Sequence, residues 1–127
     1  MRQSVIAVID DDLDLLLALD DMLISLDYRT ELYSSAEQFL KTARRSRATC
    51  LLIDVKLCDI SGIELARQLR ADGFTFPLIF MSGEVDEMVL RQAADLKSAA
   101  FLLKPFSTRR LADAVAKAMA VHSENGA

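Results

Sequence analysis

Acidic side chains follow two apolar segments of this chain. Three consecutive aspartates, residues 10–12, come directly after residues 5–9, and Asp54 follows residues 51–53. Apolar runs of about five residues closed by turn residues indicate strands buried on both faces, so the acids should emerge together at one edge of a sheet. Such a cluster repels itself and raises its own pKa values unless a divalent metal or an ammonium group lies among the oxygens.

A hydroxyl and an ammonium group follow two further apolar segments. Ser82 comes after residues 78–81, and Lys104 comes after residues 99–103. Neither histidine nor cysteine, the usual bases, is among the groups expected at this edge. Carboxylates, a hydroxyl and an ammonium group together favour phosphoryl chemistry.

The residue types suggest a role for each group. Asp10 and Asp11 offer oxygen ligands to a hard cation such as Mg²⁺, which keeps several waters and commonly takes one or two carboxylates. Asp54 can then attack phosphorus as a carboxylate nucleophile and form an aspartyl phosphate. Lys104 would pair with one phosphoryl oxygen, and the Ser82 hydroxyl would donate a hydrogen bond to another.

Each of these residues also has an ordinary explanation. An isolated acidic run favours a helix N-terminus, Asp54 can cap a turn, Ser82 with Gly83 can turn the chain, and Lys104 is of a type mostly found at the surface. Their coincidence at four strand ends favours a site. Neither a cap nor a turn explains why an apolar strand leads into Lys104 where the acids also lie.

Strands and helices are expected to alternate along the chain. The expected strands cover residues 5–9, 28–33, 50–54, 78–81 and 99–103. The expected helices cover residues 12–26, 63–71 and 86–96, together with a second helix that Ser35 and Gln38 begin as a capping box and a last helix that carries residues 111–119. Strict alternation predicts a parallel sheet with helices on both faces, whose ligands bind beyond the carboxyl ends of the strands.

Length and composition narrow the classes of function. A chain of 127 residues with 52% hydrophobic content is one domain with an ample core. Fifteen basic and nineteen acidic residues give a net charge of −4, without the basic excess that direct nucleic-acid binding requires. No run approaches the roughly 18 apolar residues of a membrane span, so we predict a cytoplasmic protein with no membrane partner. The spacing of Cys50, Cys58 and His122 disfavours a zinc site.

Four motifs together carry a family resemblance. They are, in chain order, Asp10-Asp11, Asp54 followed by Asp59-Ile60-Ser61-Gly62, Ser82-Gly83 and Lys104-Pro105-Phe106. In this order they resemble the receiver domain of bacterial two-component response regulators, over about residues 4–121, and residues 33–40 are similar to receivers of the nitrogen-fixation regulator type. The resemblance implies an α/β fold, a (βα)5 flavodoxin-like doubly wound parallel sheet with strand order 2-1-3-4-5. It also implies a receiver domain over residues 1–121, followed by a polar C-terminal tail, residues 122–127.

The resemblance implies a phosphoacceptor site in a two-component phosphorelay. Asp54 would accept a phosphoryl group from a histidine kinase or a histidine phosphotransfer protein. Asp11, Asp54 and the Lys56 carbonyl would hold Mg²⁺ or Mn²⁺, with Asp10 acting largely through water. A cis bond is expected before Pro105; such a bond costs only about 0.5–1 kcal/mol relative to trans.

The resemblance also implies a conformational switch. Ser82 would move toward the phosphoryl group, and Phe101 would turn inward into the space released, although a permanently buried core phenylalanine fits the sequence equally well. The surface read by an output partner, which the sequence does not identify, would be the fourth helix, fifth strand and fifth helix, residues 86–120; a homodimer through this surface is one arrangement that it allows. Lys56 and Glu84 occupy positions that tune dephosphorylation in this family.

Some positions depart from the family pattern. Cys58 stands where a proline is common, so residues 57–59 are expected to be more mobile, and Lys97 and Ala100 replace a frequent glycine and a common acid. None of the three removes a catalytic group.

The main alternative from another class is a Mg²⁺-dependent aspartyl-phosphate phosphatase. Such enzymes generally carry an acid two residues after the nucleophile, where this chain has Lys56. A flavodoxin-like cofactor binder would need a glycine-rich phosphate loop after the first strand, where this chain has three aspartates. We therefore predict a phosphorylated signalling domain that is not a turnover enzyme and has only intrinsic autophosphorylation and autodephosphorylation.

Overall fold

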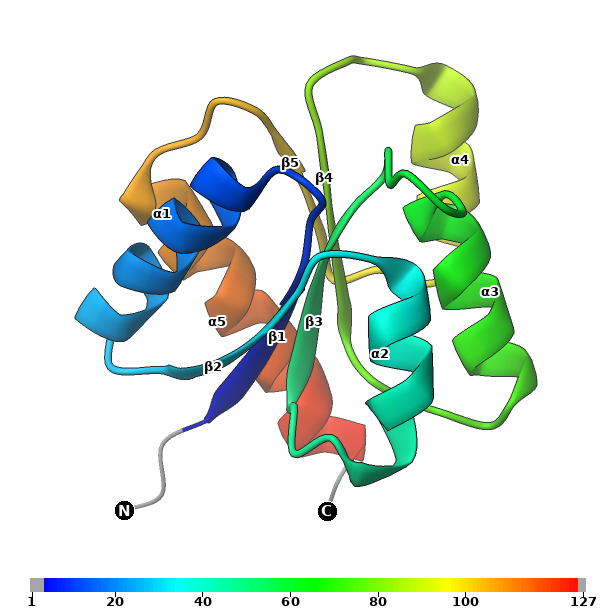
Figure 1. Cartoon of the computed structure of the whole chain (residues 1–127), viewed down its shortest axis with the longest axis horizontal. Coiled ribbons are helices and arrows are strands. Elements are labelled where there is room, and N and C mark those ends of the chain that lie inside the picture. The colour runs from blue at the N-terminus through cyan, green and yellow to red at the C-terminus, as the bar shows by residue number, and fades with distance from the viewer. Residues whose placement is uncertain (1–3, 126–127) are drawn as a thin grey trace.

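Five parallel strands form a single sheet in the computed structural model, which describes residues 4–125 (Figure 1). The elements are β1 (Val5–Ile9), α1 (Leu13–Ser25), β2 (Arg29–Tyr33), α2 (Ala36–Thr42), the short 3-10 helix η1 (Ala43–Arg45), β3 (Cys50–Asp54), α3 (Gly62–Ala71), β4 (Leu78–Ser82), α4 (Glu87–Asp95), β5 (Ala100–Leu103) and α5 (Thr108–Asn125). The strand order is β2-β1-β3-β4-β5, so the expected α/β fold and strand order are confirmed.

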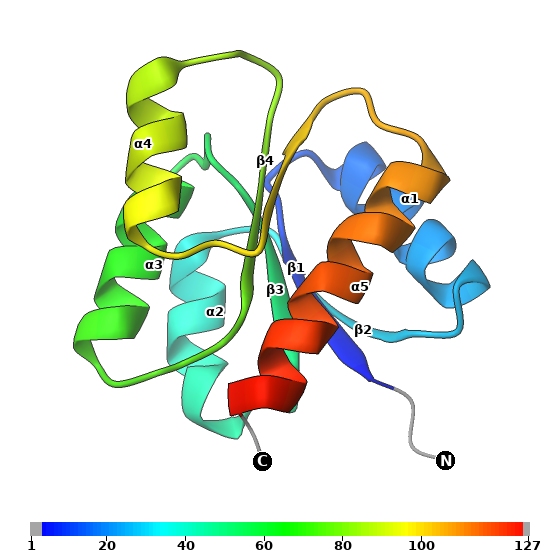
Figure 2. The same ribbon diagram turned by 180° about the vertical axis from the view of Figure 1, so that it is seen from behind.

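Helices cover both faces of the sheet. Helices α1 and α5 lie on one face, and α2, α3 and α4 lie on the other, as Figures 1 and 2 show from opposite sides. Successive side chains of a strand point to opposite faces, so Ile6 and Val8 pack under α1 and α5 while Ala7 and Ile9 pack with the other core. This division explains why the inner strands are apolar without interruption.

Side-chain caps begin most of the helices. The side chains of Asp12, Ser35, Ser61 and Asp86 each accept a hydrogen bond from a backbone N–H in the first turn of the helix that follows. The capping box expected at α2 forms only in part. Ser35 accepts from the Gln38 N–H at 3.1 Å, but the Gln38 side chain accepts from the Ser34 N–H at 2.8 Å.

The C-terminal helix is longer than the sequence pattern predicts. Helix α5 continues through Asn125, into the segment expected to be a polar tail, and residues 1–3 and 126–127 lie outside the described part of the chain. The domain boundary at residue 121 therefore stays a prediction. Among the described residues, no helix is both long and apolar enough to cross a membrane.

A close backbone contact at Gly62 joins the start of α3 to the end of β3. The Gly62 N–H donates to the Val55 carbonyl at 2.8 Å. A Cβ atom at this position would overlap the carbonyl oxygen of Asp54 and lie 2.7 Å from Cγ2 of Ile53. Only glycine therefore lets α3 begin this close to the strand that carries Asp54.

Replacing Gly62 with alanine is expected to destabilise the fold. Because the clash is with backbone and with a buried isoleucine, the Gly62→Ala variant should lose about 2–3 kcal/mol of unfolding free energy, typical of overpacking. Gly83→Ala is the matched control, since a Cβ at Gly83 meets no atom within 4 Å. Urea unfolding of both variants measures the difference, and equal stability of the two would contradict the packing argument.

Candidate functional site

The register of the sheet brings the predicted site residues to one edge. Ile9 is aligned with Ile53, so Asp10 and Asp54 leave adjacent strands side by side. Ser82 is aligned with Leu103, and the Lys104 N–H donates to the Ser82 carbonyl at 2.8 Å. The carboxyl ends of β1, β3, β4 and β5 thus deliver these groups together, as expected for a parallel sheet.

Lys104 lies between the two buried carboxylates. Its ammonium nitrogen is 3.1 Å from Oδ2 of Asp10 and 3.2 Å from Oδ1 of Asp54. The Lys104 side chain is 22% exposed, whereas those of Asp10 and Asp54 are 0% and 9% exposed. The peptide bond between Lys104 and Pro105 is cis, as the family resemblance implies.

Buried polarity is concentrated at this edge. Of the residues that the structure describes, the polar or charged ones that are buried are Asp10, Asp54 and Ser82. Burying a charged group is costly unless a partner compensates it, so chance burial of three polar side chains at one place is a poor explanation. This concentration makes the edge the candidate functional site.

The pKa values of Asp54 and Lys104 are both raised, which favours the neutral form of Asp54 and the charged form of Lys104. Burial raises the pKa of Asp54 and repulsion from Asp10 raises it further, while Lys104 and the backbone N–H of Lys56 act in the other direction without cancelling the rise. Burial acts to lower the pKa of Lys104, but attraction to Asp54 and the hydrogen bond to Asp10 outweigh it and raise that pKa. Lys104 therefore stays charged, and an additional cation near Asp54 would stabilise the ionised form of its carboxyl group.

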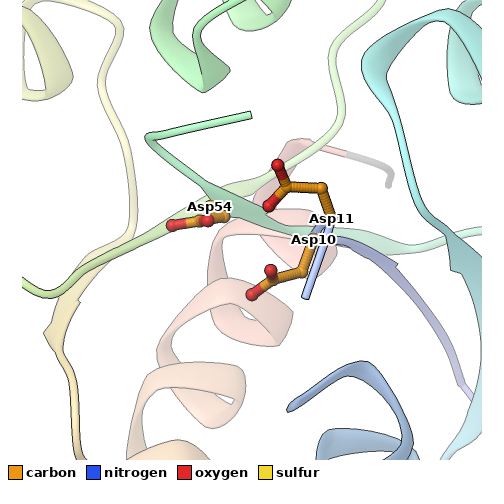
Figure 3. Close-up of side chains that lie close together, drawn as sticks. All are labelled: Asp10, Asp11 and Asp54. Atoms are coloured by element: carbon orange, nitrogen blue, oxygen red, sulfur yellow. The ribbon is translucent and has the colours of Figure 1, made fainter. Parts of the chain in front are cut away.

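A third carboxylate completes a cluster that fits a hard cation. One oxygen each from Asp10, Asp11 and Asp54 lie within 4.8 Å of one another, and Figure 3 shows the three side chains converging. Asp11 is exposed, so the cluster opens to solvent on that side. Oxygen donors with an open side suit Mg²⁺, which retains part of its water shell.

The remaining predicted residues surround this cluster. Ser82 Oγ accepts from the Glu84 N–H at 3.2 Å. Lys56 and Glu84 form an ion pair at 2.7 Å that links the loop after β3 to the loop after β4. Phe101 is half-buried on β5 and packs near Phe80, with ring centroids 6.4 Å apart. The structure therefore brings Ser82, Lys56 and Glu84 to the acidic edge and places Phe101 on the neighbouring strand.

Other candidates have structural roles. Asp12 caps α1 by accepting from the Leu15 N–H at 3.2 Å, as predicted for an acid at a helix start. Cys50 is buried, and burial raises the pKa of its thiol to about 12, whereas Cys58 is exposed in the loop after β3. The side chain of His122 lies outside the described part of the structure.

One residue near the site had no role assigned from the sequence. The Asp59 carboxylate accepts from the N–H of Glu37 at 2.9 Å and from that of Ala36 at 3.3 Å. Ser35 already explains the start of α2, so no local pattern indicates a second cap from 22 residues away. Only the tertiary structure identifies this contact.

Comparison with known proteins identifies the family. The sequence profile of the response regulator receiver domain matches residues 6–116. The chain is a response regulator receiver domain. This receiver is 36% identical over 118 residues to the response regulator protein TodT of Pseudomonas putida, an alignment that covers 93% of the chain and 52% of TodT. It is 33% identical over 106 residues to the transcriptional regulatory protein FixJ of Bradyrhizobium diazoefficiens, with coverages of 84% and 52%.

The receiver spans about half the length of these relatives. FixJ is among the matches, in agreement with the resemblance to nitrogen-fixation regulators. A solved CheY-like receiver domain from Methanospirillum hungatei superposes with a TM-score of 0.90 at 20% identity, covering 98% of this chain and 99% of that one. At that identity the likeness supports the fold alone.

The raised pKa of Asp54 leads to a prediction about stability and pH. A carboxyl group whose pKa is higher in the folded than in the unfolded state makes the fold less stable as pH rises through the interval between the two values. Without divalent metal, the Asp54→Asn variant should therefore melt at a higher temperature than the wild type at pH 7, and the gap should narrow as the pH is lowered through that interval.

Thermal melting of both proteins in a chelator measures this effect, with Asp21→Asn as a control that removes an exposed carboxylate of α1. Added Mg²⁺ should narrow the gap by stabilising the wild type more. An Asp54→Asn variant that melts below the wild type at pH 7 in chelator would show that Lys104 overcompensates the burial of Asp54.

Proposed function

We propose that this receiver is a phosphorylation-dependent switch in which Asp54 accepts a phosphoryl group from a histidine kinase or a histidine phosphotransfer protein. The observation that carries the proposal is the buried Asp54 carboxylate, held 3.2 Å from Lys104 in a cluster of three acids open to solvent. A nucleophile of this kind needs neighbouring positive charge and access for the donor, and the site offers both.

The transfer is a substitution at phosphorus. An oxygen of Asp54 forms a bond to phosphorus as the bond from phosphorus to the donor's imidazole nitrogen breaks, and the imidazole leaves with that electron pair. Lys104 remains charged beside the phosphoryl oxygens and offsets their charge. Ser82, at the end of β4, can donate its hydroxyl proton to another of these oxygens.

Asp10, Asp11, Asp54 and the Lys56 carbonyl are the groups that would hold Mg²⁺ or Mn²⁺. When bound, the cation neutralises the acids and stabilises charge on the transferred phosphoryl group. The three carboxylates contribute by position, because one oxygen of each already lies within 4.8 Å of the others.

The switch would connect Ser82 and Phe101 to the surface formed by α4, β5 and α5. Phe101 is only half-buried and packs near Phe80 against the core on the side of α2, α3 and α4, so its ring is not fully enclosed. Val85, Met88 and Leu103 are exposed apolar residues near this surface, at 71%, 68% and 47%. An output partner or a second copy of the chain would cover this surface when Asp54 is phosphorylated.

The relatives indicate the kind of protein in which such a receiver works. TodT is named as a response regulator protein and FixJ as a transcriptional regulatory protein, and the alignments leave about half of each relative unmatched. We propose a cytoplasmic receiver that contacts its donor and its output partner as proteins and does not itself bind nucleic acid or a membrane. Its acidic net charge of −4 supports this assignment.

A phosphatase of the aspartyl-phosphate type is the second candidate. Lys56, two residues beyond Asp54, is paired with Glu84 at 2.7 Å, and this pairing raises the pKa of its ammonium group, which makes it a poor general acid. We therefore propose a phosphoacceptor with only intrinsic autophosphorylation and autodephosphorylation. Steady turnover of p-nitrophenyl phosphate would favour the phosphatase.

Phosphorylation of Asp54 can be tested directly by mass. Incubation with Mg²⁺ and acetyl phosphate or phosphoramidate should add one phosphoryl group to the wild type, and none to Asp54→Asn, because an amide is not a carboxylate nucleophile. Intact-mass spectrometry measures the adduct, and omission of Mg²⁺ should reduce it sharply. The absence of an adduct on the wild type, or an equal adduct on the variant, would reject Asp54 as the acceptor.

The Lys56–Glu84 ion pair is expected to limit the entry of water to the phosphorylated site. Both side chains are largely exposed, so the pair contributes little to stability, but it joins the two loops beside Asp54. A Lys56→Ala, Glu84→Ala double variant should lose its phosphoryl group several-fold faster than the wild type, as followed by the decay of the phosphorylated mass.

Glu64→Ala, Arg67→Ala is the matched control, because it removes an exposed ion pair within α3. Its dephosphorylation rate should equal that of the wild type. An unchanged rate in the Lys56→Ala, Glu84→Ala variant would show that the pair does not control access of water.

A further inference from the structure

The loop between β3 and α3 is tied to helix α2 by a single side chain. Within residues 57–60, Asp59 makes the only hydrogen bonds to a different helix or strand in the part of the chain that the structure describes. Its two carboxylate oxygens accept from the amides of Ala36 and Glu37, the first two residues of α2. Both amides lack partners within their helix, so the contact satisfies groups that would otherwise need water.

The Asp59 carboxylate is held in its charged form. A small loss of hydration acts to raise the pKa of the exposed Asp59 carboxyl group, but the amides of Glu37, Ile60 and Ala36 outweigh it and keep the pKa below its usual value. A charged acceptor makes stronger hydrogen bonds than a neutral one, and a helix start favours negative charge. The link is therefore well suited to hold the loop.

The end of β2, which leads into α2, contacts the other segment of the site. The Asp10 N–H donates to the carbonyl of Tyr33 at 3.1 Å, and Tyr33 is the last residue of β2, three positions before Ala36. The turn from β2 to α2 thus holds the main chain at Asp10 on one side and the Asp59 carboxylate on the other. This turn therefore joins the segment of Asp10 and Asp11 to the loop that follows Asp54.

On the side of Asp59, the loop continues the main chain of the phosphoacceptor. The backbone N–H of Lys56, two residues beyond Asp54, acts to lower the pKa of the Asp54 carboxyl group. A shift of the loop would move this N–H and the Lys56 carbonyl together, since both belong to the main chain next to Asp54.

We propose that Asp59 is a positioning residue: by binding the amides of Ala36 and Glu37, it fixes the Lys56 main chain relative to Asp10 and Asp54. The consequence of this positioning is a higher affinity of the acidic cluster for Mg²⁺, and that part of the proposal rests on the proposed function. Positioning by Asp59 also accounts for a loop that has Cys58 in place of a proline, because an interelement hydrogen bond supplies the restraint that a proline ring would otherwise give.

The test separates the tie to the loop from the stability of α2. Asp59→Ala removes both hydrogen bonds, and Asp59→Asn keeps one acceptor oxygen and should have an intermediate effect. Ser35→Ala is the matched control, because Ser35 caps the same helix through a different amide, the Gln38 N–H at 3.1 Å. Residue-resolved amide exchange without metal is the first measurement, and calorimetric titration with Mg²⁺ is the second.

Asp59→Ala should speed amide exchange at Lys56 several-fold and weaken Mg²⁺ binding several-fold, with smaller changes for Asp59→Asn. Ser35→Ala should speed exchange at Gln38 and leave Lys56 and Mg²⁺ binding unchanged. Faster exchange confined to Ala36 and Glu37 in Asp59→Ala, or the same changes at Lys56 in both alanine variants, would overturn the proposal. A wild type that takes up no Mg²⁺ would contradict the proposed function. The amide exchange at Lys56, measured without metal, would still show whether Asp59 positions the Lys56 main chain.

Discussion

The contact of Lys104 with Asp10 and Asp54 is the interaction on which the site depends. Two buried carboxylates on adjacent strands would destabilise the fold if they were both ionised and unpaired. The ammonium group lies 3.1 and 3.2 Å from them, and it reaches that position because β5 ends in register with β4. A substitution that shifted β5 by one residue would turn its side chains to the opposite faces and carry Lys104 out of line with the acids.

One ammonium group does not neutralise three carboxylates. The cluster of Asp10, Asp11 and Asp54 therefore keeps an excess of negative charge, and the pKa of Asp54 stays raised in spite of Lys104. The apolar strands that lead into the site prevent water from relieving this excess on the buried side. A divalent cation can enter from the exposed side at Asp11. The excess negative charge that destabilises the fold therefore also favours binding of a cation at this site.

Local sequence patterns predicted the elements and the residues at their ends, because period, capping and burial act over a few residues. Asp12 and Ser35 cap the helices that their spacing indicated, and the four strand ends meet as parallel topology requires. Contacts between distant segments were not predictable in this way. The role of Asp59 depends on α2 lying beside the loop after β3, and the need for glycine at residue 62 depends on the approach of α3 to the Asp54 carbonyl.

The site is built from two kinds of contact that act on different properties. Inside, Lys104 and the register of the strands fix where the charges lie, and changes there alter the fold itself. At the surface, the Lys56–Glu84 pair joins two loops and the Asp59 carboxylate joins one of them to α2. A single exposed ion pair contributes little to stability. Such contacts can change without unfolding the protein, so we expect these positions to be where receivers with the same interior differ in metal affinity and in the lifetime of the phosphorylated state.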